Sequence, residues 1–298
     1  MNRVLNNRDN LIEGIVVKAY GGFFYIHDGR DVRECTLRGR LRHRKQLVLV
    51  GDRVLMAPSN DKGGVVEDVL PRHSILTRPK VANVDQAVII FSLREPEPNQ
   101  GLLERFIIMA ALNRILPIIC FNKVDLAVGC QVEFVSSYRE NYNVVVTSAK
   151  TGQGLSDLKA ALNNKISVFA GPSGVGKSSI LNSLIPGLKQ KTGAVSTRLG
   201  TGRHTTRHIE LIPLEEGGFV ADTPGFSNLD LPNIKPEELA GLFPGISNYQ
   251  TNCYFSGCLH YEEPGCSIKK AVEQGEIDEA CYRQYLESLG QLMDRRRY

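Results

Sequence analysis

A glycine-rich segment has the residue types and the spacing needed to bind a triphosphate. It reads G-P-S-G-V-G-K-S-S, and its candidate binding residues are Gly171, Pro172, Ser173, Gly174, Val175, Gly176, Lys177, Ser178 and Ser179. The run ISVFA precedes it and SSILNSL follows it, which is the strand–loop–helix context that this motif requires. Glycines let backbone N–H groups turn toward phosphate oxygens, Lys177 neutralises β- and γ-phosphate charge, and Ser178 ligates Mg²⁺. The loop predicts binding of a magnesium–nucleotide complex but does not indicate which base the nucleotide carries.

Two short polar motifs, each after an apolar strand-like run, can read a guanine base. The first follows LPIICF and the second follows NVVVT, and together they comprise Asn122, Lys123, Val124, Asp125, Ser148, Ala149 and Lys150. The Asp125 carboxylate can accept hydrogen bonds from the ring N–H and the exocyclic amine of guanine. Adenine would leave that carboxylate unpaired, a mismatch that can discriminate by about 10⁴-fold. We expect Asn122 to tether neighbouring loops, Lys123 to lie along the base, and the backbone of the second motif to contact the guanine oxygen.

A further pair of motifs has the residues that sense a γ-phosphate. Asp222 and Gly225 belong to D-T-P-G, which follows the strand-like run GGFVAD. Asp222 would hold Mg²⁺ through water, and the Gly225 amide would contact the γ-phosphate. Upstream, GRHTTRH contains Thr205 and Thr206, and one of them would complete the magnesium coordination. We favour Thr206 as this switch threonine; an ordinary loop hydroxyl is the alternative.

The residue that follows D-T-P-G cannot orient a water molecule for attack. Many GTPases have a glutamine there, whereas this chain has Phe226. Unassisted hydrolysis of GTP to GDP should therefore be slow, and two sources of help are open. One is His204, which can accept or orient a proton near neutral pH, and the other is a residue supplied by a partner. His204 could equally be a solvent-facing loop histidine.

Three cysteines and a histidine cluster near the C-terminus at a spacing that suits zinc. Cys253, Cys258, His260 and Cys266 supply three thiolates and an imidazole. Four such ligands form a closed tetrahedral site with no position for a substrate water, so we predict one structural Zn²⁺. Buried free cysteines are the alternative, but three thiols and a histidine rarely cluster by chance.

The elements that position these residues fall into three stretches of the chain. Residues 1–72 contain short strand-like runs separated by turn residues, which predicts a small all-β barrel. Residues 73–230 alternate buried-strand runs with helical runs, which predicts an α/β domain with a parallel sheet and helices on both faces. Ligands bind such sheets at the carboxyl ends of strands, where the nucleotide motifs lie. Residues 231–298 are helical and irregular and contain the cysteine cluster.

An arginine-rich segment lies within the predicted barrel. Arg38, Arg40, Arg42 and Arg44 occupy every second position, so an extended backbone would place all four on one face. Such a face could contact a nucleic-acid phosphate backbone. The alternative is a solvated charged loop.

Composition narrows the class of protein. The 298 residues are 42% hydrophobic and 23% charged, as in ordinary soluble proteins. No run of about 18 apolar residues is present, so we expect no membrane span. The first ten residues lack the apolar region of a signal peptide, and we expect a cytoplasmic protein. The net charge of +4 is too small to indicate nucleic-acid binding by itself.

The order of the nucleotide motifs is rotated. A conventional GTPase begins with the phosphate loop and ends with N-K-x-D and S-A-K, whereas here those two motifs come first. The order predicts a circular permutation, in which the conventional ends are joined near residues 152–165 and the chain is cut after D-x-x-G. Surface termini that lie close together make such a rearrangement tolerable. Because D-T-P-G now leads into the cysteine-bearing segment, we hypothesise that the nucleotide state repositions the C-terminal domain.

These residues resemble the RsgA (YjeQ) family of circularly permuted, ribosome small-subunit-dependent GTPases. The resemblance rests on the order of NKVD, SAK, GPSGVGKSS and DTPG, on GRHTTRH, on the N-terminal barrel and on CYFSGCLHYEEPGC, and it covers essentially the whole chain. It implies an OB-fold barrel, a circularly permuted P-loop GTPase domain and an α-helical zinc-binding domain. It also implies a bacterial factor that acts late in maturation of the small (30S) ribosomal subunit, which stimulates its GTP hydrolysis. We further expect contact with ribosomal RNA and a monomeric state.

Two other functions fit parts of the sequence. A GTP-driven metal or cofactor chaperone would need an exchangeable thiol site, whereas four ligands form a closed one. A P-loop kinase would have no need of N-K-x-D to read guanine. The sequence therefore favours the RNA-dependent GTPase.

Overall fold

The chain forms two compact units, each assembled from several stretches of sequence. The computed structural model describes residues 11–43, 47–59, 63–77, 80–127, 131–185, 187–188, 209–222, 234–243 and 245–295. The first unit takes its described residues from Met1–Gln86, Gly154–Phe169 and Ser178–Phe226. The second takes them from Ala87–Gln153, Ala170–Lys177 and Ser227–Tyr298.

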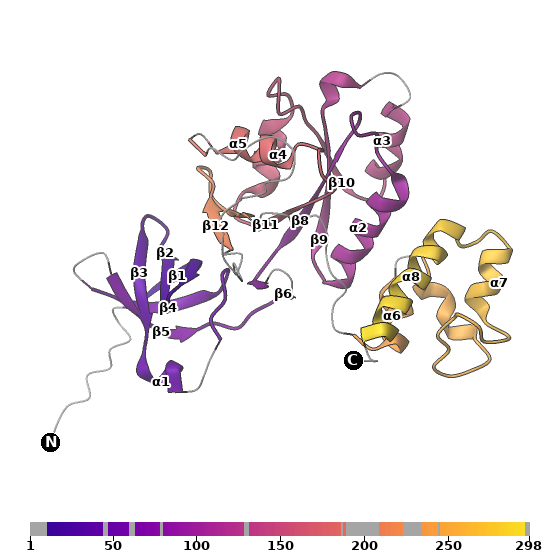
Figure 1. Cartoon of the computed structure of the whole chain (residues 1–298), viewed down its shortest axis with the longest axis horizontal. Coiled ribbons are helices and arrows are strands. Elements are labelled where there is room, and N and C mark those ends of the chain that lie inside the picture. Colours follow the sequence, from indigo (N-terminus) through magenta and orange to yellow (C-terminus); the bar gives the residue numbers. More distant parts are fainter. Residues whose placement is uncertain are drawn as a thin grey trace, which may run out of the picture. The chain divides into compact units, whose positions relative to one another are not determined.

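The first unit contains the predicted β-barrel (Figure 1). Its strands are β1 (Ile12–Tyr20), β2 (Phe23–His27), β3 (Val32–Leu37), β4 (Arg53–Pro58) and β5 (Gly63–Val69). They are paired in the order β1-β2-β3-β5-β4, and β4 pairs back with β1, so the sheet closes on itself. The pairing is antiparallel except between β3 and β5. A closed five-stranded barrel with this mixed pairing is OB-like, as expected.

Alternation of side chains fills the barrel. Strands place successive residues on opposite faces, so one residue in two points inward. The interior is an apolar cluster that includes Val16, Ile26, Cys35, Met56 and Val66. The β1–β2 turn is Gly21-Gly22, and both have positive φ, as two-residue hairpin turns require.

The arginine-rich segment is not extended, so the backbone that would place the four arginines on one face is not formed. After β3 the chain turns into a short helix, α1 (Gly39–His43), and buries Leu41 beneath it. Arg38 forms an ion pair with the Glu67 carboxylate, and Arg40 Nη2 donates to the Glu67 carbonyl at 2.6 Å. Arg44 lies outside the described residues. Burial of Leu41 and pairing of the arginines with Glu67 together favour a short helix, although the arginines alternate as on one face of a strand.

Part of the predicted sheet also belongs to the first unit. Its elements are β6 (Ile75–Thr77), β7 (Lys80–Ala82), α4 (Leu155–Leu162), β11 (Ile166–Ala170), α5 (Lys177–Leu184), β12 (Glu210–Pro213) and β13 (Phe219–Asp222). Strand β11 is parallel to β13, as predicted. Strand β12 is antiparallel to β13, so the sheet is mixed rather than wholly parallel.

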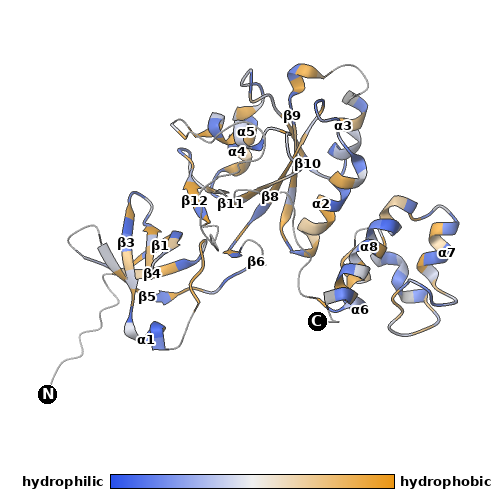
Figure 2. Cartoon of the chain, viewed as in Figure 1, coloured by the Kyte–Doolittle hydropathy of each residue, from blue (hydrophilic) through white to orange (hydrophobic). Residues whose placement is uncertain are grey.

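The second unit holds the remaining strands of the nucleotide-binding domain and the C-terminal helices. It comprises β8 (Gln86–Ser92), α2 (Gln100–Leu112), β9 (Leu116–Asn122), the 3₁₀ turn η1 (Val124–Leu126), α3 (Gln131–Arg139), β10 (Asn143–Val146), α6 (Pro236–Leu242), η2 (Ser247–Asn252), α7 (Ser267–Glu273) and α8 (Glu279–Arg295). The strand order is β10-β9-β8, and β9 and β10 are parallel. All seven residues of β8 are buried, and Figure 2 shows it apolar along much of its length, whereas α8 carries polar residues. The apolar runs that were predicted to be buried strands are therefore strands in the structure.

Among the residues that the structure describes, none of the helices combines the length and the apolar character that a membrane span requires.

Candidate nucleotide site and metal centre

Asn122 joins the loops that were predicted to hold the nucleotide. This side chain lies at the end of β9 and is 1% exposed. Its Nδ2 donates to the Val175 carbonyl in the glycine-rich loop at 2.9 Å, and its Oδ1 accepts from the Ala149 amide at 3.1 Å. Thr147 Oγ1 donates to the same Oδ1 at 3.3 Å. One buried side-chain amide therefore holds the predicted phosphate-binding loop next to the predicted base-binding loop.

The glycine-rich loop needs glycine at its two ends. Gly171 and Gly176 have φ values of 139° and 97°, a region that side chains disfavour. A Cβ at Gly171 would lie 2.1 Å from the Ile90 carbonyl oxygen, and one at Gly176 would lie 2.3 Å from Asn122 Nδ2. The loop leads into α5, and a helix N-terminus presents free N–H groups to anions. Ser178 and Ser179 are in the first turn of that helix.

Lys177 folds across the mouth of the loop. Its Nζ donates to the Gly171 and Pro172 carbonyl oxygens at 2.8 and 2.7 Å. Burial lowers the pKa of this ammonium, because a low-dielectric surrounding disfavours the charged form. A phosphate group bound in the loop would supply the negative charge that this half-buried cation lacks.

The base-loop candidates are also brought together. Ser148 is fully buried, and its Oγ donates to Asp125 Oδ1 at 2.7 Å. The same Oγ accepts from the Thr151 amide at 3.1 Å, which fixes the hydroxyl proton toward Asp125. Lys123 has a left-handed backbone and donates through Nζ to the Glu95 carbonyl. The carboxylate and the lysine are thus both positioned by neighbours rather than left free.

The γ-phosphate and switch candidates are described only in part. Asp222 ends β13, and its backbone is opposite Glu210 in β12. His204, Thr205, Thr206 and Gly225 lie outside the described residues, as does Phe226. Their predicted roles remain predictions.

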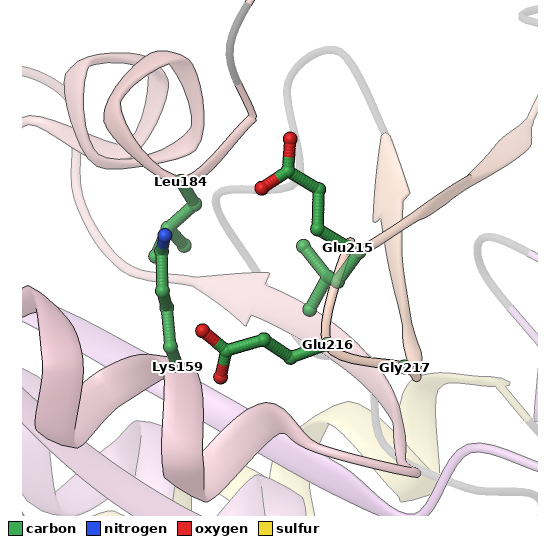
Figure 3. Close-up of a pocket in the computed structure, with 6 residues that line it drawn as sticks. Lys159, Leu184, Glu215, Glu216 and Gly217 are labelled. Atoms are coloured by element: carbon green, nitrogen blue, oxygen red, sulfur yellow. The ribbon is translucent and has the colours of Figure 1, made fainter.

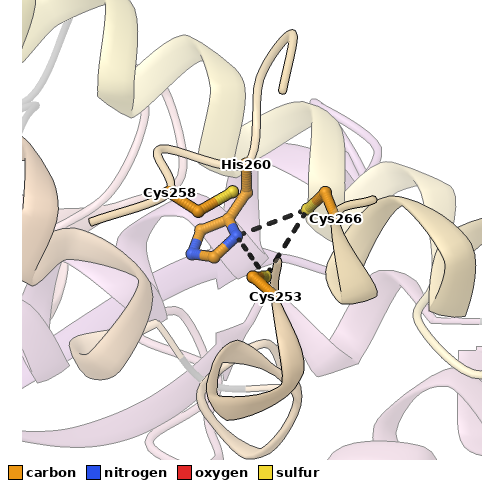
Figure 4. A group of neighbouring side chains, drawn as sticks. All are labelled: Cys253, Cys258, His260 and Cys266. Atoms are coloured by element: carbon orange, nitrogen blue, oxygen red, sulfur yellow. Dashed lines mark hydrogen bonds between the residues drawn. The ribbon is translucent and has the colours of Figure 1, made fainter. Parts of the chain in front are cut away.

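The four predicted metal ligands converge in the second unit (Figure 4). The ligand atoms of Cys253, Cys258, His260 and Cys266 all lie within 4.8 Å of one another. His260 Nδ1 is 3.4 Å from the sulfurs of Cys253 and Cys266, and those sulfurs are 3.9 Å apart. A tetrahedral zinc ion with ordinary bond lengths would place sulfurs about 3.8 Å apart and nitrogen about 3.6 Å from sulfur. The donor set and its spacing therefore fit Zn²⁺.

Burial governs the protonation of these ligands when no cation is bound. Burial raises the pKa of Cys258 to about 12 and also raises that of Cys266. For Cys253 burial acts in the same direction, but hydrogen bonds with the hydroxyl and amide of Ser267 and with the thiols of Cys266 and Cys258 outweigh it, and the pKa is lowered. Burial lowers the pKa of His260, which keeps the imidazole neutral and able to bind a cation. Such thiols become thiolates when a cation takes the place of their protons.

The loop that carries His260 is held from outside the ligand set. Tyr282 and Tyr285, both in α8, donate through their hydroxyls to the carbonyls of His260 and Leu259 at 2.7 and 2.8 Å. On the other side, the Glu263 carboxylate accepts from the Leu259 amide at 2.7 Å. None of these three residues was predicted from the sequence, because the motif spacing identifies the ligands and not the residues that support them.

A small hollow elsewhere in the first unit is not a nucleotide site. It lies among α4, α5 and the β12–β13 turn, where Lys159 and Leu184 face Glu215 and Glu216 (Figure 3). Its volume of about 10 Å³ has room for one water molecule.

Comparison with known proteins agrees with this geometry. A family model described as "RsgA GTPase" matches residues 69–232, and one described as "RsgA N-terminal domain" matches residues 13–66. A protein named small ribosomal subunit biogenesis GTPase RsgA from Moorella thermoacetica is 47% identical over 287 residues, which are 96% of this chain and 99% of that protein. The protein of the same name from Bacillus velezensis is 44% identical over 292 residues, 95% of this chain and 98% of its own.

Two solved structures share the architecture. The crystal structure of YjeQ from Thermotoga maritima has a TM-score of 0.77 and 38% identity, covering 95% of this chain and 99% of that one. YloQ, titled a circularly permuted GTPase, has a TM-score of 0.76 and 39% identity, covering 98% and 99%. The fold and the converging loops thus define a circularly permuted P-loop GTPase with an OB-like barrel and a C-terminal cluster that fits zinc. Within that class, the chain belongs to the RsgA GTPase family. Its members are GTP hydrolases that use Mg²⁺ with GTP, which sets aside the kinase interpretation.

Proposed function

We propose that this protein hydrolyses GTP during late assembly of the small ribosomal subunit, which stimulates the reaction. The observation that carries the proposal is the buried Asn122 amide, because it joins a phosphate-binding loop to a guanine-reading loop. The names of the relatives supply the biological context, since they are small ribosomal subunit biogenesis GTPases.

The roles of the site residues follow from their chemistry. The loop Gly171–Ser179 wraps the phosphates, Lys177 neutralises the β- and γ-phosphates, and Mg²⁺ when bound neutralises charge that develops on the phosphates. Asp125 reads the guanine edge. The backbone of Ser148–Lys150 contacts the guanine oxygen.

The switch residues complete the site. Ser178 and Thr206, or Thr205 in its place, would coordinate the magnesium ion, and Asp222 would hold it through water. The Gly225 amide contacts the γ-phosphate. Because Phe226 cannot orient the water, His204 or a group from the subunit does so.

Three domains divide this work. Residues 1–72 form an RNA-binding OB-fold barrel, residues 73–230 the permuted GTPase domain and residues 231–298 the zinc-binding helical domain. The barrel strands end at Val69, close to the first boundary. Cys253, Cys258, His260 and Cys266 would hold a structural Zn²⁺ that stabilises the last domain, a role suited to four protein ligands. Ribosomal RNA is the partner of the barrel, and the protein acts as a cytoplasmic monomer.

The test measures GTP turnover by the protein alone and with purified small subunits. Large subunits and free ribosomal RNA serve as activator controls, and Lys177→Ala serves as the inactive enzyme. Strong stimulation by small subunits only, absent in Lys177→Ala, is the expected result. Equal turnover with every addition would overturn the ribosomal part of the proposal. Equal turnover by Lys177→Ala and wild type would overturn the assignment of Lys177 and its loop as the phosphate-binding site.

A further inference from the structure

The segment that follows β8 forms a turn against the base-reading motif. The Leu93 amide donates to the Asn122 carbonyl at 3.0 Å, and Ser92 Oγ donates to the Pro96 carbonyl at 2.5 Å. Between these two anchors, the Glu95 carbonyl accepts from Lys123 Nζ. The turn is therefore attached to the N-K-V-D segment at two points, the backbone carbonyl of Asn122 and the side chain of Lys123.

The same turn approaches the phosphate loop. The nearest neighbour of a Cβ built at Gly174 is Pro96 Cδ, at 3.7 Å. An added Cβ would be in ordinary van der Waals contact with Pro96, so Pro96 lies close beside the loop without crowding it. The turn thus bonds to the motif that reads the base and lies next to the loop that holds phosphates.

Two left-handed residues meet at this contact. Glu95 has φ of 56° and Lys123 has φ of 62°, and the side chain of one bonds the backbone of the other. Glutamate gains nothing locally from this conformation, unlike asparagine or glycine. Backbone strain of this kind persists where the surroundings hold it, and such places cluster at ligand sites.

The contact has a physical use for a lysine that must lie along a base. A free lysine side chain has many accessible rotamers, and a nucleotide would have to remove that conformational freedom on binding. With Nζ already held by the Glu95 carbonyl, the alkyl stem is ordered before the nucleotide arrives. Ordering in advance raises affinity without adding any contact to the ligand.

We propose that the turn Leu93–Pro96 forms a further wall of the guanine-nucleotide site, with Glu95 as the positioning residue for Lys123. This inference rests on the proposed function of the loops. The role belongs to the Glu95 carbonyl and its left-handed backbone, not to the carboxylate, which is exposed.

The test compares variants that change the backbone with variants that change only the charge. Glu95→Val removes the carboxylate and disfavours the left-handed backbone, and it should weaken binding of fluorescent methylanthraniloyl-GDP about tenfold. Glu97→Val makes the same substitution at an exposed glutamate two residues on, whose φ is not left-handed, and should change the Kd less than twofold. Glu95→Gly lacks the carboxylate but tolerates the backbone, so it should recover the affinity that valine loses.

A double-mutant cycle separates positioning from general damage. In a Lys123→Ala background, Glu95→Val should have little further effect on the Kd, because the positioned side chain is gone. In subunit-stimulated turnover, Glu95→Val should raise KM and leave kcat within about twofold, since Lys123 acts on the base and not on the γ-phosphate. If Glu95→Val fails to fold, Ser92→Ala loosens the same turn without backbone conflict and should weaken binding about threefold through the same cycle.

Three results would overturn the inference. They are unchanged affinity in both Glu95→Val and Ser92→Ala, equal loss in Glu95→Gly and Glu95→Val, and an undiminished loss in the Lys123→Ala background. Failure of the wild-type protein to bind methylanthraniloyl-GDP would instead overturn the proposed function itself.

Discussion

Replacement of Gly176 by alanine should weaken nucleotide binding far more than the same replacement at Gly174. Both glycines have positive φ, 97° and 82°, where alanine costs about 1–2 kcal/mol. Their surroundings differ. A Cβ at Gly176 would lie 2.3 Å from Asn122 Nδ2, whereas the nearest neighbour of one at Gly174 is Pro96 Cδ at 3.7 Å. The Gly174 variant therefore controls for backbone strain, and the difference between the variants isolates the clash with Asn122.

The size of that difference follows from the hydrogen bonds of Asn122. The clash displaces its amide from the Val175 carbonyl at 2.9 Å and from the Ala149 amide at 3.1 Å. Because Asn122 is 1% exposed, the displaced groups cannot turn to bulk water, and each costs about 1–3 kcal/mol. We expect about 2–6 kcal/mol beyond the strain, since both loops must recover this arrangement to bind nucleotide. Gly176→Ala should then bind about 30- to 20,000-fold more weakly than Gly174→Ala.

The assay is a fluorescence titration of methylanthraniloyl-GDP against wild-type protein and both variants. Circular dichroism melts without nucleotide show whether each variant remains folded, which a change in the Kd alone does not. A Kd for Gly176→Ala within about threefold of that for Gly174→Ala would refute the reasoning. It would mean that the contact between Asn122 and the phosphate loop has no role in binding.

The remaining predictions concern base choice, metal and acid stability. Asp125→Asn should shift the preference from GTP to xanthosine triphosphate, because an amide there complements an exocyclic oxygen, and the ratio of the two kcat/KM values measures it; retained GTP preference would contradict the base-reading assignment. Cys258→Ala should lose zinc and lower the melting temperature, since apparent zinc-binding energies of about 10 kcal/mol couple to folding; Cys281→Ala, outside the cluster, should keep its zinc in metal analysis. The Asp31 amide, with help from Arg33, holds the pKa of Asp28 at about 2. That carboxylate therefore stabilises the fold above about pH 4 and loses its effect as pH falls toward 2, so the stability difference from Asp28→Asn in urea melts should shrink over this interval.

The sequence predicted those parts of the fold and site in which chemistry restricts residue types. Only glycine tolerates the backbone at Gly171 and Gly176, and only a few side chains bind zinc. The residue types alone therefore identify these positions in the sequence. The buried-strand runs were equally clear, because five consecutive residues in the wholly buried strand β8, from Ala87 to Phe91, are apolar.

Prediction failed where distant residues decide the local structure. The alternating arginines would share one face on an extended backbone, but burial of Leu41 and pairing with Glu67 accompany a short helix, α1, instead. Nothing in the neighbourhood of Arg38 or Arg40 announces Glu67, which is more than twenty-five residues away. The tyrosines that support the metal loop were missed for the same reason, because their hydroxyls bond backbone carbonyls that any residue would supply.

The rotated motif order did not prevent the site from being recognised, and the structure explains why. Asn122 reaches forward in sequence to both Ala149 and Val175, across separations of 27 and 53 residues. Loops at the carboxyl ends of neighbouring strands meet at one edge of a sheet whatever the order in which the chain visits those strands. A permutation therefore changes which loop contains the chain ends, but the loops that form the site still lie together at the same edge of the sheet. What it does change is the segment that follows Asp222. The chain after β13 now leads to α6 and then to the segment between η2 and α7, which carries the metal ligands, instead of to another strand of the sheet.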